Sequence, residues 1–123
     1  MFYKIKGVAK KPMDKEILKG HLPILILGIL KETPLHGYAI CREIRTRGKG
    51  ELNLREGTLY PILYRLERQG HIKSSWETAP SGKQRKVYRA TRSGVKLIEA
   101  HKLDWTRLMT LFSTFLGEGW VKQ

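Results

Sequence analysis

The amino-acid sequence predicts a mostly α-helical fold with one small β-hairpin. Apolar residues recur at helical spacing in three segments before residue 70 and in one long segment after residue 91. Between them, apolar and polar residues alternate in two short stretches, which a loop containing Pro and Gly separates, as expected for a hairpin. The chain has 123 residues and no internal repeat, so we expect one domain with one modest core.

The first helix is expected to follow Asp14, which suits the N-cap position, and to end near residues 31–33. Pro23 lies inside this segment and should bend or split the helix, because proline lacks the backbone N–H that a helix interior requires. The residues expected to form its buried stripe are Ile17, Leu18, Leu22, Leu25 and Leu30.

A second helix is expected over residues 36–47 and a third within residues 53–70, with a glycine-bearing connection between them. Gly70 follows the last periodic residue and should end the third helix. The residues expected to point inward are Tyr38, Ile40, Cys41 and Ile44 in the second helix, and Leu59, Ile62, Leu63 and Leu66 in the third.

The opposite face of the third helix is flat and basic and carries two tyrosines. Such a face fits the major groove of DNA, although an ordinary surface helix with solvated arginines accounts for this segment alone equally well. The residues of this face are Gly57, Pro61, Tyr64 and Arg68, flanked by Tyr60 and Arg65.

The predicted hairpin has its strands around residues 72–77 and 86–91. Residues 71–94 contain six lysines or arginines and one acid. A basic hairpin directly after the second helix of a helix-turn-helix is a wing, whose side chains can neutralise phosphates along a duplex. The sequence therefore predicts a winged helix-turn-helix.

A last long helix is expected from the cap residue Thr91 to about Gly117. Apolar residues recur along it with a spacing of seven, and the segment 103–116 is too hydrophobic to face only one small domain and water. We therefore expect a second copy of the chain to cover this helix in a homodimer. The residues expected at the dimer interface are Ile98, Trp105, Leu108, Phe112 and Phe115.

Trp105 fits two roles, and the two are compatible. It can anchor the dimer interface, or it can form, with its two-fold copy, the walls of an apolar cavity. Flat aromatic ligands would stack in such a cavity.

Lysine and arginine number 24 against 11 acids, and the resulting net charge of +13 indicates an anionic partner, either nucleic acid or an anionic membrane. The longest apolar run, residues 22–30, is too short to span a membrane, and no signal peptide is recognisable.

One cysteine excludes an internal disulfide and favours a reducing, cytoplasmic compartment. The four scattered histidines and the lack of catalytic motifs predict no metal, no cofactor and no enzyme activity.

From Met13 to about Leu116 the chain resembles a short PadR-family transcriptional regulator. The similarity rests on MDKEILKGHLPILILGIL, LHGYAICREI, LREGTLYPILYRLERQGHI and SGKQRKVYRATRSG. It implies a dimeric winged-helix repressor that contacts DNA through the third helix and the DNA backbone through the wing. The residues that it implies are Gly57, Thr58, Tyr60, Pro61, Tyr64 and Arg65 in the third helix, and Lys83, Arg85 and Lys86 in the wing.

The chain departs from the family pattern in two places. The wing reads Gly-Lys-Gln-Arg at residues 82–85, where Gly-Arg-Pro-Arg is common, and Arg55 stands at the N-cap position of the third helix, where Ser is common. The resemblance also places Trp105 where an aromatic residue on the last helix lines a drug-binding pocket in members of the short subfamily.

These observations predict a basic arm over residues 1–12, a winged helix-turn-helix over 13–94 and a dimerisation helix with a tail over 95–123. The expected function is sequence-specific DNA binding by a homodimeric repressor that a small aromatic ligand relieves. The alternative is an architectural protein that binds DNA through charge alone.

Overall fold

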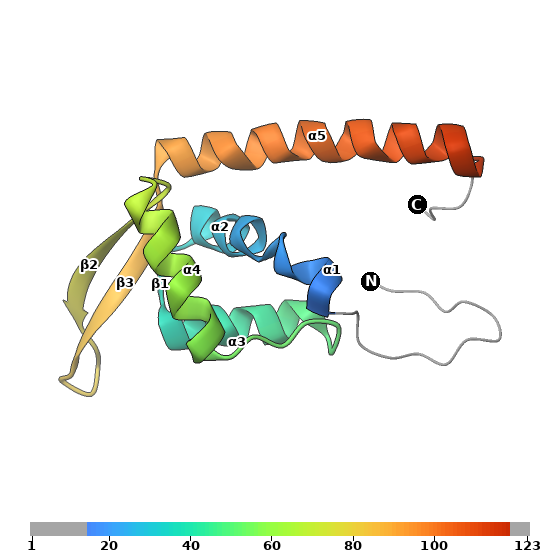
Figure 1. Ribbon diagram of the computed structural model, residues 1–123. Coiled ribbons are helices and arrows are strands. Elements are labelled where there is room, and N and C mark those ends of the chain that lie inside the picture. Colours follow the sequence, from blue (N-terminus) through green and yellow to red (C-terminus); the bar gives the residue numbers. More distant parts are fainter. Residues whose placement is uncertain (1–14, 119–123) are drawn as a thin grey trace.

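The computed structural model describes residues 15–118, which form five helices and a three-stranded antiparallel sheet (Figure 1). The expected fold class is confirmed, and β2 and β3 project from the helices as a wing. The arm expected over residues 1–12 and the end of the expected tail, 119–123, lie outside the described residues. The elements are α1 (Lys15–Lys19), α2 (Leu22–Glu32), β1 (Leu35–His36), α3 (Gly37–Gly48), α4 (Glu56–Arg68), β2 (Ile72–Thr78), β3 (Gln84–Ala90) and α5 (Arg92–Leu116).

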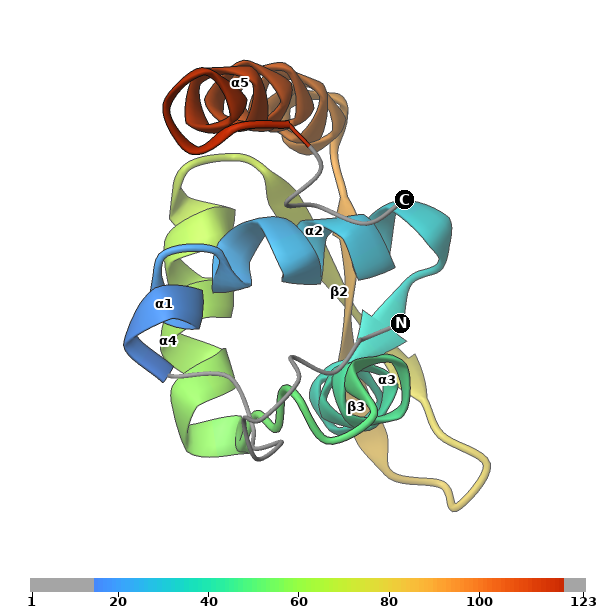
Figure 2. The same ribbon diagram turned by 90° about the vertical axis from the view of Figure 1, so that its right-hand side faces the viewer.

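Helix α2 lies at the centre of the helical part, with α5 on one side of it and α3 and α4 on the other (Figures 1 and 2). Apolar side chains from α2, α3, α4 and β2 meet there and form the core. Removing each such side chain from water contributes about 1.5–3 kcal/mol. Among the described residues, the largest fully buried side chains are Ile26, Leu27, Ile40, Leu59, Leu63 and Ile72.

The expected first helix is split into α1 and α2 by a turn at residues 20–21. Pro23 lies in the first turn of α2, where a backbone N–H would have no acceptor within the helix, so the missing N–H of proline costs no hydrogen bond. A single apolar stripe therefore does not run through both helices, and the predicted burial of Ile17 and Leu25 is wrong, since 62% and 40% of their surfaces are exposed. Both residues instead line a pocket beneath α5.

Strand β1 was not predicted from the sequence. It pairs antiparallel with β3, with His36 opposite Val87, and two residues are too few to show a periodicity. Helix α3 consequently begins at Gly37, and the predicted burial of Tyr38 is wrong, since 54% of its surface is exposed. The Tyr38 ring stacks on His36 with centroids 6.4 Å apart, and the Arg42 guanidinium lies 5.6 Å from its centroid.

The junction between the wing and α5 depends on Thr91, which caps α5 as predicted. Its hydroxyl accepts a hydrogen bond of 3.2 Å from the Gly94 N–H and donates one of 2.7 Å to the Gly70 carbonyl. Gly94 lies so close to the backbone carbonyl of His71 that a β-carbon would clash there. These contacts fasten the start of α5 to the connection between α4 and β2.

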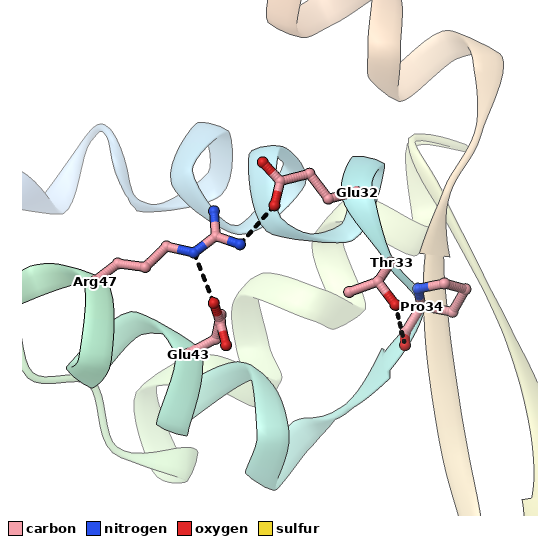
Figure 3. Close-up of polar contacts among 5 residues, drawn as sticks. All are labelled: Glu32, Thr33, Pro34, Glu43 and Arg47. Carbon is pink, nitrogen blue, oxygen red and sulfur yellow. Dashed lines mark hydrogen bonds and ion pairs between the residues drawn. The ribbon is translucent and has the colours of Figure 1, made fainter.

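Arg47 joins α3 to α2 (Figure 3). Its Nη2 donates to Glu32 Oε1 at 2.6 Å, and its Nε donates to Glu43 Oε1 at 2.7 Å. The hydrogen bond to Glu32 and then that to Glu43 raise the pKa of Arg47, so the guanidinium stays charged. The two acids neutralise this side chain, which therefore adds little to the positive surface of the protein.

Candidate nucleic-acid interface

Helix α4 separates its residues into a buried stripe and an exposed face. Leu59, Ile62, Leu63 and Leu66 are buried as predicted. The opposite side is exposed, with 65% of Tyr64 and 44% of Tyr60 open to solvent, and the Arg68 guanidinium lies 5.8 Å from the Tyr64 ring centroid. We call this side the α4 outer face; its residues are Gly57, Thr58, Tyr60, Pro61, Tyr64, Arg65 and Arg68, which are all the residues predicted in this helix to contact DNA.

Tyr60 connects the α4 outer face to the start of α3. Its phenol fills the space that a β-carbon on Gly37 would occupy, so this glycine allows the two helices to approach. Burial raises the pKa of Tyr60, and the neighbouring Glu56 raises it further, so the phenol remains protonated at neutral pH. A protonated phenol can both donate and accept hydrogen bonds at this edge of the interface.

The first turn of α4 has no side-chain cap, because Arg55 stands at the N-cap position and makes no capping hydrogen bond. Its carbonyl accepts from the N–H groups of Thr58 and Leu59, both at 3.0 Å. Pro61 lies inside the helix and has no N–H to donate to the carbonyl of Gly57. The end of α4 nearest α3 therefore presents backbone polar groups alongside its side chains.

The wing carries the three predicted backbone contacts, but their environments differ. Arg85 donates from Nε and Nη2 to Oε2 of Glu77 on the paired strand, at 3.0 and 2.9 Å. Lys83, in the loop, and Lys86, on β3, are exposed and take part in no ion pair with another described residue. The two lysines are therefore freer than Arg85 to neutralise phosphates, a difference that the sequence alone did not reveal.

The wing and α4 are joined on their facing sides. The Ser74 hydroxyl of β2 donates a hydrogen bond of 2.6 Å to Glu67 Oε2 of α4. Tyr88 of β3 is buried behind them, and burial raises its pKa, with smaller contributions from Tyr60 and Glu67. These contacts link the wing directly to α4.

Helix α5 exposes most of the apolar residues predicted for the dimer interface. Ile98 is the exception, because only 5% of its surface is exposed and it packs in the core of its own chain. The apolar surface that α5 offers to another chain therefore begins beyond Ile98. The predicted residues along this surface are Trp105, Leu108, Phe112 and Phe115, with exposed fractions of 47%, 36%, 41% and 78%.

An open apolar pocket of about 630 Å³ lies between α5 and the helices α1 and α2. Trp105 forms one wall, and the His21 ring meets it edge to face with centroids 5.6 Å apart. Ile17 and Leu25, the two residues of the predicted first stripe that are exposed, also line this pocket. Trp105 therefore borders a ligand-sized space even within a single chain.

The described residues contain no cluster of three or more His, Cys, Asp or Glu side chains that could hold a metal ion. Within the same part of the chain, no helix is long and apolar enough to cross a membrane.

The sequence interpretation assigned no role to Trp76, a residue of the wing with 67% of its surface exposed. The alternating pattern gives Trp76 the same face as Ile72, which is in the core, so the pattern alone does not reveal that Trp76 is exposed.

The chain is similar in sequence and fold to known regulators. It is 33% identical to a PadR family transcriptional regulator from Eggerthella lenta, whose crystal structure matches with a TM-score of 0.73 over 85% of this chain and 88% of that one. A PadR family transcription regulator from Clostridium difficile is 35% identical, with a TM-score of 0.69 over 80% of this chain and all of that one. Transcriptional regulator Rv3488 of Mycobacterium tuberculosis is 32% identical over 80 residues, which are 65% of this chain and 71% of that protein.

The family model described as the transcriptional regulator PadR-like family matches residues 26–100. That segment includes α3, α4, both wing strands and the start of α5, which carry the α4 outer face and the wing lysines. The match extends over more than half of the chain, so the protein belongs to the PadR-like family of transcriptional regulators.

Proposed function

We propose that this protein is a sequence-specific repressor that binds duplex DNA as a homodimer. The observation that carries the proposal is the pairing of the α4 outer face with the basic wing at one side of the domain. In a winged helix-turn-helix, the second helix reads base edges in the major groove and the wing follows the phosphates. The role as a repressor rests on the resemblance to the PadR family.

An architectural protein that recognises DNA by charge alone is the second candidate. The net charge of +13 is compatible with it. The composition of the α4 outer face favours sequence reading, because glycine, proline and tyrosine lie where a protein that relies on charge would carry lysines. Tyr60 and Tyr64 can donate hydrogen bonds to bases or pack on thymine methyl groups.

The homodimer is supported by the apolar side of α5. Leu108, Leu111 and Phe115 expose between 36% and 78% of their surfaces to solvent. A continuous apolar surface of this kind is rarely left in contact with water by a small domain, so its presence indicates that another molecule covers it. In a two-fold dimer the same surface of each copy meets the other, so each copy contributes one α4 outer face to the assembly.

A small aromatic effector is supported by the pocket beside Trp105. The pocket volume of about 630 Å³ suits a drug-sized molecule, and its walls are mainly apolar. Such a ligand would weaken DNA binding if it favoured a spacing of the two subunits that fits the operator poorly. The required coupling is modest, typically about 1–3 kcal/mol.

Selection of random duplexes by the full-length protein, followed by sequencing, tests the DNA-binding proposal. The expected result is a near-palindrome whose half-sites lie about one helical turn, roughly 34 Å, apart. Selected duplexes without any shared sequence would instead support the architectural protein. Selected sites without two-fold symmetry, bound by a monomer, would contradict the dimer.

The effector is tested by titrating planar dyes or phenolic acids while tryptophan fluorescence is recorded, first with the wild type and then with Trp105→Ala. The expected result is quenching that disappears in the variant, together with weaker operator binding by the wild type when the ligand is present. Equal quenching of both proteins would remove Trp105 from any ligand site.

A further inference from the structure

Trp76 is a large aromatic side chain that neither the core nor the dimer interface uses. It lies on β2 with 67% of its surface exposed. Alternate residues of a strand share one face, so Trp76 lies on the same side of the hairpin as Ile72 and Ser74. Ile72 is in the core and Ser74 donates to Glu67 of α4, so this face looks toward α4. Trp76 therefore lies on the side of the wing that faces α4, with most of its surface uncovered.

The charges around Trp76 suit an anionic partner. Lys86, its cross-strand neighbour on β3, places Nζ 6.0 Å from the indole centroid and forms no ion pair with any described residue. The acid of the hairpin, Glu77, lies on the opposite face, where Arg85 binds it. A cation and an apolar ring thus stand together on the side of the wing that faces α4, where the Glu67 carboxylate of α4 accepts a hydrogen bond from Ser74.

We propose that Trp76 and Lys86 bind the sugar–phosphate backbone of one DNA strand on the side of the wing that faces α4. This inference rests on the proposed DNA-binding function. With α4 in the major groove, a strand that borders the groove passes between α4 and the wing. The indole packs against the apolar face of a deoxyribose, and the Lys86 ammonium meets the adjacent phosphate.

The chemistry of this contact predicts how it contributes to binding. Sugar and phosphate are the same at every base pair, so the contact adds affinity for operator and random duplexes alike. Trp76 carries no charge, and its contribution therefore does not depend on salt, whereas that of Lys86 does. The contributions of Trp76 and Lys86 to binding can therefore be distinguished by their dependence on salt concentration.

The test compares four full-length variants on operator and random duplexes over a range of salt concentrations. Trp76→Ala should weaken binding to both duplexes about fivefold, at the lower end of the effect of aromatic side chains that stack on nucleic acids, and should leave the salt slope unchanged. Trp76→Phe should retain most of the affinity. Lys86→Ala should lower the salt slope by about one, and Lys73→Ala, which removes the same charge from the other face of β2, should not.

Fluorescence gives a second readout on a protein whose wing is intact. The chain has three tryptophans, so replacing Trp105 and Trp120 by Phe leaves Trp76 as the single reporter. Its emission should change saturably as duplex DNA is added. No change in emission while a mobility shift shows binding would overturn the inference.

The outcomes separate this inference from the proposed function. A wild-type protein that binds no duplex would overturn the proposed function itself. Normal affinity of Trp76→Ala for both duplexes would overturn only the role of the wing tryptophan. A loss confined to the operator would make Trp76 a reader of bases and would overturn its assignment to the backbone.

Discussion

Ser74 of β2 donates a hydrogen bond of 2.6 Å to Glu67 of α4, and this contact sets the wing beside the helix proposed to read DNA. Both side chains are partly buried, and the acceptor is a carboxylate, which makes the hydrogen bond stronger than a neutral one. Glu67 is thereby bound by the protein itself, so it repels an approaching phosphate less than a free carboxylate would.

Ser74→Ala should lower the free energy of unfolding by roughly 1–3 kcal/mol, because it leaves a partly buried carboxylate with one hydrogen bond fewer. It should also weaken DNA binding, since the wing is less firmly placed. Urea unfolding and mobility shifts measure the two effects. Ser75→Ala, an exposed serine on the opposite face of the same strand, is the matched control and should change neither quantity. Equal behaviour of the two variants would contradict this role for Ser74.

Gly94→Ala and Gly28→Ala should have opposite effects on stability. A β-carbon at Gly94 would meet the backbone carbonyl of His71 and a methyl group of Leu27, so we expect a loss of roughly 1–3 kcal/mol. Gly28 lies inside α2, where an added β-carbon would have no atom within 4 Å, so alanine should stabilise the protein by about 0.5–1 kcal/mol. Thermal unfolding of both variants measures the difference, and a destabilised Gly28→Ala would contradict the packing around α2.

Tyr64→Ala and Arg65→Ala should reduce discrimination between operator and random DNA, because residues of the α4 outer face contact base edges. A good base contact contributes roughly 1–3 kcal/mol of discrimination. Lys83→Ala in the wing loop should weaken binding to all duplexes alike and lower the salt slope by about one. Binding titrations at several salt concentrations measure both effects. Equal losses on both duplexes for all three variants would refute α4 as the reader.

Leu108→Glu and Phe112→Glu should prevent dimer formation, because each places an unpaired charge in the proposed apolar interface on α5. Sedimentation velocity should show monomers. Arg107→Glu is the control, since 84% of that side chain is exposed on the same helix, and it should remain dimeric. Stable dimers of both test variants would mean that the interface lies elsewhere.

Stability should fall as the pH decreases below about 6.5, in part because of His36. Burial, followed by the charges of Arg85 and Arg42, lowers the pKa of His36 from that value. The unfolded chain therefore binds more protons than the native state over the interval between the two pKa values, so acidification favours unfolding. His36→Gln should make the slope of unfolding free energy between about pH 5 and pH 7 shallower. An unchanged slope in urea titrations would exclude this contribution.

The parts of the fold that could be predicted from the sequence are those whose pattern repeats within one element. The stripe of α4 recurs over several turns, and the cap at Thr91 is a local feature, so both agree with the structure. Likewise, the residues of the α4 outer face share one side of a helix because of its period alone.

The parts that could not be predicted depend on contacts between elements. Tyr38 was expected inside, yet its ring stacks on His36 of β1, the strand that pairs with β3, and 54% of its surface is exposed. Ile98 was placed in the dimer seam because its heptad spacing cannot distinguish a residue buried in its own chain from one buried by a partner. The ion pair between Arg85 and Glu77 requires the strand register, which the hairpin sequence leaves open.

The length of helix α5 amplifies any rotation at its start. α5 has 25 residues in one unbroken helix, about 37 Å long, and its start is fastened to the connection between α4 and β2 through Thr91 and Gly94, while its apolar surface lies toward the other end. A rotation of about 5° around that junction displaces the far end by about 3 Å, given this length. At Trp105, which is 13 residues and therefore about 20 Å from the start of the helix, the same rotation gives a displacement of about 1.7 Å.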